Sequence, residues 1–315
     1  MRISVIIPAY NAVAYIERAI QSVLAQTRPA EEIIIINDGS TDNTAKVLQR
    51  YEGQIRIIHQ SNAGVSAARN AGIRAATGDW IAFLDADDEW LPEKLQLQSE
   101  LLIRHPTLCW VTGNFLFCRC RQNHLQSPAL SEKQIPDFKR RMGETDYFDS
   151  YFQACQRDAA GNTNTMLVRK DKLLEAGLFP EGQTRIEDDD LWLRLAYLDL
   201  KVGYVSEPVA VYHTEVTNSA TQQTPNPAYI DLFLSRHLCL ASQTGHLALF
   251  RRCAKYKLGF WIYTLLTNNQ GRAVRELLKK YGDLLSPYTR WTSYIGSLCP
   301  GLWRWNEKRK HPELE

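Results

Sequence analysis

Three carboxylates follow an apolar segment within four positions, and this cluster is the part of the sequence best suited to chemistry. The apolar run Trp80–Leu84 predicts a buried strand, and Asp85, Asp87 and Asp88 come directly after it. Like charges this close repel one another and raise one another's pKa, so a positive partner is expected. Hard divalent cations prefer oxygen ligands and keep open positions for phosphate. The cluster therefore predicts a divalent metal ion that also holds a phosphorylated ligand.

A helix N-terminus is the alternative interpretation of the same cluster. Asp88 or Glu89 can cap a helix that begins near Pro92. Such a cap explains one carboxylate well and the three together poorly. The residues of this segment therefore favour the metal ion over the cap.

A second acidic cluster, Glu187–Asp190, begins the predicted helix Ile186–Leu200. The dipole of a helix favours carboxylates at its N-terminus, which accounts for part of this charge. Four carboxylates in a row exceed what capping requires. A carboxylate beside a metal-bound phosphate ester can act as general base for an incoming hydroxyl, and this is the chemistry that the second cluster suggests.

Two polar segments follow the first two predicted strands. Pro8-Ala9-Tyr10-Asn11 follows the first strand, and the tyrosine ring can stack on a nucleobase. The segment Asn37–Thr44 supplies Asp38, which can accept hydrogen bonds from a base or a ribose. An Asp-Gly turn followed by a Ser/Thr helix cap explains the second segment as well, so both interpretations of Asp38 stay open.

The segment Asn62–Gly72 predicts a helix of small residues that carries one long cation, Arg69. Small residues let a helix lie close to a sheet or a ligand, from where Arg69 would reach a base or a phosphate. A tightly packed helix with Arg69 solvated, or paired with an acid, is the alternative. On this segment alone that alternative is favoured.

Alternating strands and helices position these residues. Strand–helix alternation with buried strands predicts an α/β fold whose parallel sheet is covered on both faces, and ligands of such sheets bind at the carboxyl ends of the strands. Asp38 and the cluster Asp85–Asp88 would both lie on that rim. The expected strands are Ile3–Pro8, Glu32–Asn37, Ile55–His59 and Trp80–Leu84, and the expected helices are Val13–Gln26, Thr41–Tyr51, Val65–Ala76 and Glu93–Arg104.

The later part of the chain predicts fewer strands and more helices. Residues 118–145 are polar and irregular, which is typical of a lid or a disordered insertion. From about Pro227 the pattern is helical to near Pro300. Further strands are expected at Leu108–Phe117, Thr163–Val168 and Val209–His213, and a short helix at Lys170–Ala176.

Composition limits the class of protein. No stretch of about 18 uncharged apolar residues occurs, so no membrane-spanning helix is expected. The N-terminus is predicted to be a strand and not a secretory signal. The seven cysteines are scattered, and Cys118 and Cys120 lack a second pair at zinc-finger spacing. We expect buried free thiols in a reducing cytoplasm.

The near-neutral net charge hides an asymmetry. Residues 1–248 hold 24 Lys or Arg and 30 Asp or Glu, whereas residues 249–315 hold 13 and 5. Half of the tryptophans, including Trp303 and Trp305, also fall in this basic tail. A basic, tryptophan-rich end predicts an anionic membrane surface as partner. An ordinary helical subdomain with solvated Lys and Arg is the alternative.

The motifs taken together, in this order and spacing, resemble family 2 glycosyltransferases of the GT-A fold. The resemblance is strong over residues 1–105, good over about 160–200 and weak after about 220. It is carried by Ser4–Asn11, Asn37–Asp42, Asn62–Gly72, Phe83–Asp88 and Glu187-Asp188.

On the donor side, the resemblance implies that Asp38 binds uracil or an equivalent base. Pro8, Ala9 and Tyr10 match the loop around the nucleoside, and Arg69 matches an arginine that contacts the nucleotide. UDP-linked sugars are the commonest donors of such enzymes. The resemblance thus implies a nucleotide-diphosphate sugar as the donor.

The resemblance also assigns the metal and the acceptor side. Asp85 and Asp87 match an Asp-x-Asp motif, with Asp87 the direct ligand of Mn²⁺ or Mg²⁺ and Asp85 nearer the ribose. Asp188 matches the general base, and Glu187 helps to position it or the acceptor. Transfer with inversion to a hydroxyl of a saccharide or a lipid-linked saccharide is implied, of the type that builds bacterial cell-surface polysaccharides, without a nucleic acid. Asp88, with Glu89, then fits the helix start better than a ligand role.

Two departures from the family pattern matter. The segment Val211–Glu215 replaces the Arg-x-His that many relatives carry, so His213 is equally a metal contact or a structural histidine. No Gln-x-x-Arg-Trp follows Glu187, which argues against a processive synthase. The resemblance further implies a catalytic domain over residues 1–225, divided near 105, and a helical extension over 226–315.

Other classes of protein fit less well. A dehydrogenase requires a Gly-x-Gly-x-x-Gly turn after its first strand, and the residues there are Pro8-Ala9-Tyr10-Asn11. A sugar nucleotidyltransferase would carry a glycine-rich loop at the same place. A non-catalytic sugar-nucleotide-binding or lectin-like module would not need both acidic clusters. We expect a cytoplasmic enzyme, peripheral on the inner face of the cell membrane.

Overall fold

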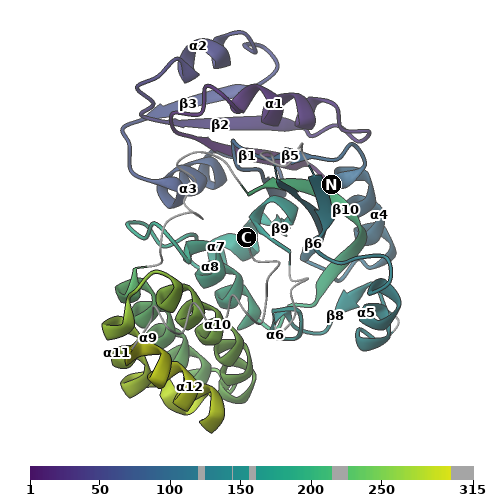
Figure 1. Cartoon of the computed structure of the whole chain (residues 1–315). Helices are drawn as coiled ribbons and strands as arrows, with labels where there is room; N and C mark the ends of the chain where they lie inside the picture. Colours follow the sequence, from purple (N-terminus) through teal and green to yellow (C-terminus); the bar gives the residue numbers. More distant parts are fainter. Residues whose placement is uncertain (120–124, 144, 156–160, 215–225, 299–315) are drawn as a thin grey trace. The chain divides into compact units, whose positions relative to one another are not determined.

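A computed structural model gives the structure of the chain, and it describes residues 1–119, 125–143, 145–155, 161–214 and 226–298 (Figure 1). Cys120, Trp303 and Trp305 lie outside the described residues. Contacts divide the chain into two units, Met1–Ser219 and Ala220–Glu315. Residue 225, at which the sequence predicts the boundary, also lies outside the described residues.

A ten-stranded sheet forms the centre of the first unit, in the order β3-β2-β1-β4-β9-β6-β10-β5, with β7 paired to β6 and β8 to β10. The strands are β1 Ile3–Ala9, β2 Glu32–Asp38, β3 Arg56–Gln60, β4 Trp80–Phe83, β5 Glu89–Trp90, β6 Trp110–Arg119, β7 Leu125–Pro128, β8 Tyr147–Phe148, β9 Leu167–Arg169 and β10 Val202–His213. The first four pair in parallel, as do β6 and β10, whereas β9 runs antiparallel to both β4 and β6. The α/β class and a mostly parallel central sheet are confirmed.

The helices of this unit are α1 Ile16–Leu24, α2 Thr44–Gln49, α3 Val65–Ala75, α4 Lys94–Arg104, α5 Ile135–Arg141, α6 Tyr151–Ala154, α7 Lys170–Glu175 and α8 Glu187–Ala196, with a 3₁₀ turn η1 at Thr163–Thr165. Figure 1 shows α1 and α2 on one side of β1–β3 and α3 on the other. The four consecutive isoleucines of β2 are buried because both faces of the strand are covered.

Helix α3 lies against β1 and β2 because its residues are small. A Cβ atom added to Gly72 would come within 2.5 Å of the Ile6 side chain. Any larger residue would push the helix away from the sheet. The close approach that the small residues predict is therefore present, and it positions Arg69 at the rim.

Several elements differ from the sequence prediction. The expected loop over 118–145 contains β7 and α5 in its described part, and the expected strand Thr163–Val168 divides into η1 and β9. The late strand begins at Val202 and not at Val209. Its pairing with β6 shifts register near Pro208, and the sequence predicted only the part of the strand after this bulge.

The second unit is helical where it is described, as the sequence predicts from Pro227 onward. Its elements are α9 Pro227–Gln243, α10 Leu247–Thr267, α11 Gly271–Tyr281, a 3₁₀ turn η3 at Gly282–Leu284, and α12 Pro287–Leu298. Phe233, Phe250 and Trp261 form its core. Within the described ranges, none of the helices combines the length and the hydropathy needed to cross a bilayer.

Candidate active site

The loops that follow β1 and β2 are tied together by Asn11. Its side-chain oxygen accepts hydrogen bonds from the backbone N–H groups of Thr41, at 2.8 Å, and Asp42, at 3.3 Å. The backbone of Asn11 takes the left-handed conformation, with φ of 48°. Pro8 and Ala9 are buried in β1, whereas Tyr10 is 53% exposed. The tyrosine ring is thus held at the rim with a face accessible to a ligand.

Asp38, at the end of β2, shapes the loop that leads into α3. Its carboxylate accepts hydrogen bonds from Gln60 Nε2 at 2.7 Å and from the backbone N–H groups of Ala63 and Gly64, each at 2.9 Å. The side chain is buried. A carboxylate has about four acceptor positions, so three internal bonds leave room for one more. Nucleobase binding by Asp38 stays a prediction.

Arg69 joins the two acidic clusters that the sequence keeps 102 positions apart, Asp85 and Glu187. Its guanidinium donates to Asp85 Oδ1 at 2.7 Å and to Glu187 Oε1 at 3.0 Å. It also lies 5.1 Å from the centre of the Phe179 ring. Burial alone would lower the pKa of Arg69, but the charges of Asp85 and Glu187 outweigh it and the pKa is raised. The structure thus gives Arg69 two acidic partners, and its contact with the nucleotide stays a prediction.

Asn164, in η1, holds the strand end of the first acidic cluster, and the sequence did not point to it. Its side-chain oxygen accepts from the backbone N–H of Asp85 at 2.7 Å, and its amide nitrogen donates to Asp88. Its backbone oxygen accepts from Trp90 Nε1 at 2.9 Å. The polar triplet Thr163–Thr165 at the start of a predicted strand was the available signal. A fully buried Asn needs such partners.

Replacing Asn164 with Leu should lower the free energy of unfolding by about 2–4 kcal/mol. The change removes two side-chain hydrogen bonds, so that the backbone N–H of Asp85 and one oxygen of the buried Asp88 carboxylate each lose a partner. Urea unfolding of the full chain measures the effect.

Asn162→Leu is the matched control, two positions earlier. The Asn162 side-chain amide has no hydrogen-bond partner within the described ranges, so its loss should cost little. Equal destabilisation by both variants would show that Asn164 acts by packing alone.

Asp88 is not a helix cap, and that sequence interpretation is wrong. Its side chain is completely buried and accepts a hydrogen bond from the backbone N–H of His213 at 2.7 Å. Helix α4 begins only at Lys94, and Glu89 belongs to β5. Burial raises the pKa of Asp88 well above its usual range, and the charges of Asp87 and Asp85 add to the rise. Asp88 therefore links the acidic strand end to β10, a contact between distant segments that no local pattern reveals.

His213, at the end of β10, has the contacts of a structural histidine. Its Nε2 lies 3.1 Å from Glu89 Oε1, and its backbone N–H bonds to Asp88. The side chain is 3% exposed. These contacts close the antiparallel pairing of β10 with β5. A metal contact by His213 stays a prediction.

Asp87, the neighbour of Asp88 in the chain, is a partly buried carboxylate. Burial raises the pKa of Asp87 to about 6, and the charge of Asp85 contributes to the rise. Arg18 donates to the backbone oxygen of Asp87 and not to its carboxylate. Within the described ranges, no group of three or more His, Cys, Asp or Glu side chains has a metal-site arrangement. Oxygen donors whose charges repel one another nevertheless fit a Mg²⁺ or Mn²⁺ ion that keeps other positions for phosphate.

The second cluster begins α8, directly after Ile186, whose φ of 68° turns the chain into the helix. Thr163 Oγ1 donates to Asp188 Oδ2 at 3.1 Å, and the backbone N–H of Asp189 donates to Asp188 Oδ1 at 2.8 Å. Glu187 is buried beside Arg69. Asp188 thus has a fixed orientation and is half-buried, as a proton acceptor at a rim would be.

Glu187 should make stability depend on pH near neutrality. Burial, and then the charge of Asp188, raise its pKa from 4.5 to about 7, although Arg69 opposes the rise. The folded chain therefore binds this proton more tightly than the unfolded chain. Its stabilising effect is fully present below about pH 4.5 and is lost as the pH rises through about 7. Relative to wild type, Glu187→Gln should gain about 1–3 kcal/mol of unfolding free energy between about pH 5 and pH 8.

The measurement for this prediction is urea unfolding of both proteins at several pH values. Glu181→Gln, a change at an exposed glutamate that precedes the same helix, is the control. A pH-independent difference between Glu187→Gln and wild type would contradict the prediction.

Residues 4–165, just over half of the chain, match the profile of the family described as Glycosyl transferase family 2. The amylovoran biosynthesis glycosyltransferase AmsB of Erwinia amylovora is 30% identical over 296 residues, which cover 88% of this chain and 94% of AmsB. An uncharacterised glycosyltransferase of a Nostoc species is 54% identical over 100 residues, which cover 30% of this chain. The chain spans less than a third of the length of that protein and of several other curated relatives.

Among solved structures, TarS of S. aureus (its 1–349 form, in complex with UDP-GlcNAc) is similar with a TM-score of 0.66 at 18% identity, covering 94% of this chain and 89% of that one. A likeness at this identity concerns the fold alone, and it confirms the GT-A fold with a helical C-terminal region. Together with the profile match and the near full-length similarity to AmsB, the site leads to one conclusion: this chain belongs to glycosyl transferase family 2.

Proposed function

We propose that this chain transfers a sugar, with inversion, from a nucleotide-diphosphate sugar to a hydroxyl of a saccharide or a lipid-linked saccharide. One observation carries the proposal. Asp85 and Glu187 both lie within hydrogen-bond distance of the Arg69 guanidinium, so that the two acidic clusters form a single site. A donor diphosphate at the first cluster would then lie beside a proton acceptor in the second.

The chemistry is a single displacement. The acceptor oxygen forms a bond to the anomeric carbon while the bond from that carbon to the diphosphate oxygen breaks. The hydroxyl proton passes to a carboxylate oxygen of Asp188. The hydrogen bonds from Thr163 and the Asp189 N–H fix this carboxylate, and each of its oxygens keeps a further lone pair for the proton. The products are a glycoside and a nucleoside diphosphate.

Asp87 and Asp85 would hold the divalent metal ion. When bound, Mg²⁺ or Mn²⁺ neutralises charge on the leaving diphosphate. Asp38 and Tyr10, at the ends of β2 and β1, would hold the nucleoside with the backbone of Pro8 and Ala9. The buried guanidinium of Arg69 would keep the two carboxylates that flank it, Asp85 and Glu187, from repelling each other.

The names of the similar proteins support a donor and an acceptor class. UDP-GlcNAc is bound in the TarS complex, which favours a UDP-linked donor, and AmsB is named for amylovoran biosynthesis, which favours a polysaccharide product. The proposed acceptor is thus a growing cell-surface saccharide. The proposed place of action is the cytoplasmic face of the cell membrane, because lipid-linked acceptors are anchored there and residues 249–315 are basic.

A donor screen tests the proposal. The full chain is incubated with UDP-, GDP- and dTDP-sugars, with a pool of saccharide acceptors, with and without Mn²⁺, and the released nucleoside diphosphate is measured. Release from a UDP-sugar that requires Mn²⁺ supports the proposal. Tight binding of a nucleotide sugar without release would instead support a non-catalytic sugar-nucleotide-binding module. In a separate incubation, formation of a nucleotide sugar and pyrophosphate from a sugar phosphate and a nucleoside triphosphate would support a nucleotidyltransferase.

A further inference from the structure

Helix α12 of the second unit buries small residues and exposes its large apolar ones. A helix of a soluble protein turns its apolar stripe toward the core. In α12 the buried residues are Ser293, Gly296 and Ser297. The large apolar and aromatic residues are exposed instead, with Tyr288 75% and Trp291 63% accessible. The full exposed set is Tyr288, Trp291, Tyr294, Ile295 and Leu298.

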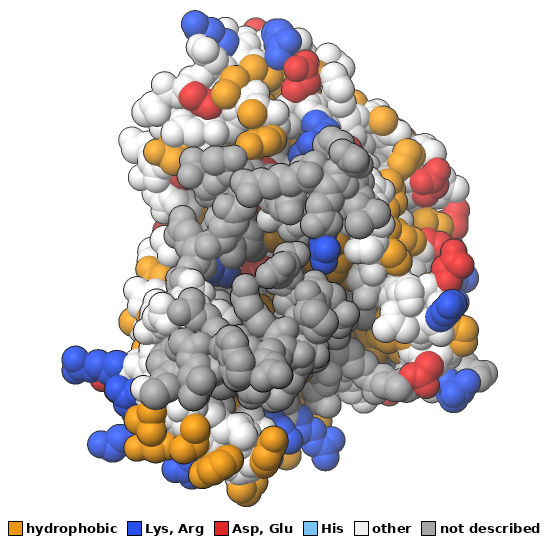
Figure 2. Space-filling view, viewed as in Figure 1, with side chains coloured by type: hydrophobic (Ala, Val, Ile, Leu, Met, Phe, Trp, Pro, Cys, Tyr) orange, Lys and Arg blue, Asp and Glu red, His pale blue; other side chains and the backbone are white. Residues whose placement is uncertain are grey.

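These exposed residues form one continuous strip. Positions 288, 291, 295 and 298 follow the i, i+3, i+7, i+10 spacing that places side chains on a single face of a helix. At about 1.5 Å per residue the strip is about 15 Å long. Figure 2 shows hydrophobic side chains gathered at the lower end of the view, where Figure 1 has α11 and α12. A contiguous exposed apolar surface of this kind is typical of a binding surface.

Cations lie beside the strip. Helix α12 contains Arg290 and no acidic residue, and α11 contributes Arg275 and Lys279. A hollow of about 920 Å³ is lined by these three cations together with Trp291 and Tyr294. Its acidic lining residue, Asp283, is within salt-bridge distance of Arg251.

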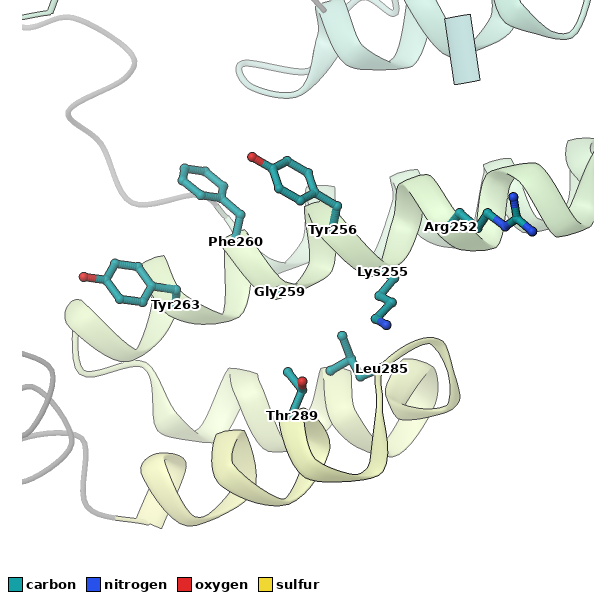
Figure 3. Close-up of a pocket in the computed structure, with 8 residues that line it drawn as sticks. All are labelled: Arg252, Lys255, Tyr256, Gly259, Phe260, Tyr263, Leu285 and Thr289. Carbon is teal, nitrogen blue, oxygen red and sulfur yellow. The ribbon is translucent and has the colours of Figure 1, made fainter. Parts of the chain in front are cut away.

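A second hollow, of about 490 Å³, is also lined by aromatic and basic side chains, here from α10. It shares Leu285 with the first hollow. Figure 3 shows Tyr256, Phe260 and Tyr263 on one side of α10, with the Lys255 side chain directed toward Leu285. Over residues 226–298 there are ten Lys or Arg and three Asp or Glu. All three acids have basic partners: Asp231 with Lys280, Glu276 with Arg272, and Asp283 with Arg251. Positive charge therefore exceeds negative charge over this range.

We propose that the exposed face of α12 docks on an anionic lipid bilayer. Tryptophan and tyrosine prefer the boundary between headgroups and acyl chains, because one part of each ring system is apolar and another is polar. Lysine and arginine beside them are attracted to anionic headgroups. A helix that lies in the plane of the interface needs both features, and α12 with α11 supplies them. The inference rests on the proposed function only for its purpose, because docking on a membrane is useful to an enzyme whose acceptor is anchored there.

Vesicle flotation of the full-length chain tests this docking. Wild type should float with vesicles that contain phosphatidylglycerol in phosphatidylcholine, less so at high salt, and little with phosphatidylcholine alone. Trp291→Ser combined with Ile295→Ser should weaken the binding to anionic vesicles about tenfold or more, because it removes the centre of the apolar strip. Both residues are exposed, so the variant should fold, and its unchanged thermal unfolding checks this.

The matched control combines Ile103→Ser with Leu174→Ser, two apolar residues of the first unit that are 75% and 48% exposed. This control should float like wild type. Equal flotation of the α12 variant and wild type would overturn the inference, and so would a wild type that does not bind anionic vesicles. A wild-type oligomer that the α12 variant dissociates, with flotation unchanged, would assign the face to a second copy of the chain.

The flotation result is independent of catalysis. Nucleoside diphosphate release from a soluble donor and a soluble acceptor should be the same for wild type and for the α12 variant. A chain that floats but releases no nucleotide would contradict the proposed function and leave the docking face intact. A chain that releases nucleotide but does not float would contradict the docking face alone.

Discussion

Asp188→Asn should lower the rate of sugar transfer about a thousandfold and leave binding of the donor nucleotide nearly unchanged. Asparagine keeps the size of the side chain, and its oxygen can still accept one of the two hydrogen bonds that Thr163 and the Asp189 N–H make. It cannot take up the proton of the acceptor hydroxyl. General base catalysis contributes about a hundredfold to ten-thousandfold, which sets the size of the effect. Initial rates of nucleoside diphosphate release and calorimetric binding of UDP measure the two quantities.

Asp189→Asn is the matched control, because Asp189 is the next carboxylate of the same helix and is also half-buried. It should retain most of the wild-type rate. Near-normal turnover by Asp188→Asn would reject the assignment of Asp188 as the base. A large loss in both variants would point to the charge at the N-terminus of α8 and not to proton transfer.

Asp87→Asn should abolish the response to divalent metal ions and reduce turnover about a thousandfold. A metal ion that neutralises a leaving diphosphate contributes several kcal/mol, which corresponds to this factor. Ionised Asp87 is costly in the folded protein, since burial and the charge of Asp85 both oppose its ionisation. The variant should therefore be at least as stable as wild type without metal. Loss of activity would then not reflect loss of the fold.

Two measurements separate these effects. Mn²⁺ with UDP should raise the melting temperature of wild type, because a ligand that binds only the folded state stabilises it, and this rise should be absent in Asp87→Asn. Asp79→Asn, at the opposite end of β4 and more than half exposed, is the control and should behave like wild type. Full wild-type activity in the presence of a chelator would reject the metal role of Asp87.

The sequence predicted the elements whose apolar pattern is local. The runs in β1 and β2 are apolar at successive positions, and in the structure these strands are buried on both faces. Of the apolar stripe expected in α1, Ile16, Ala19, Ile20 and Val23 are buried, whereas Leu24 is 41% exposed. The small residues of α3 also predicted its close approach to the sheet, because only small side chains fit there.

The parts of the site that the sequence did not predict depend on contacts between distant segments. Asp88 looked like a helix cap because the residues near it in sequence include Pro92, whereas its true partners are Asn164 and the backbone of His213. The sequence left Arg69 as a ligand contact or as a cation that is solvated or paired with an acid. The pairing is present, but its two acidic partners are 16 and 118 positions away and could not be named from the sequence. No periodicity encodes such pairings. The acidic motifs could be recognised, but not the residues that hold them.

The shared ion pair of Arg69 has a consequence for folding. A chain ending near residue 105 would contain β1–β4, Asp38, Arg69 and Asp85, yet Arg69 would have lost Glu187 and Asp85 would have lost Asn164. Closing loops of this length costs chain entropy that is repaid only when β9 and α8 are in place. The two acidic clusters thus become organised in one cooperative unit, and a nascent chain carries the motifs of its first half before it carries the arrangement of the candidate site.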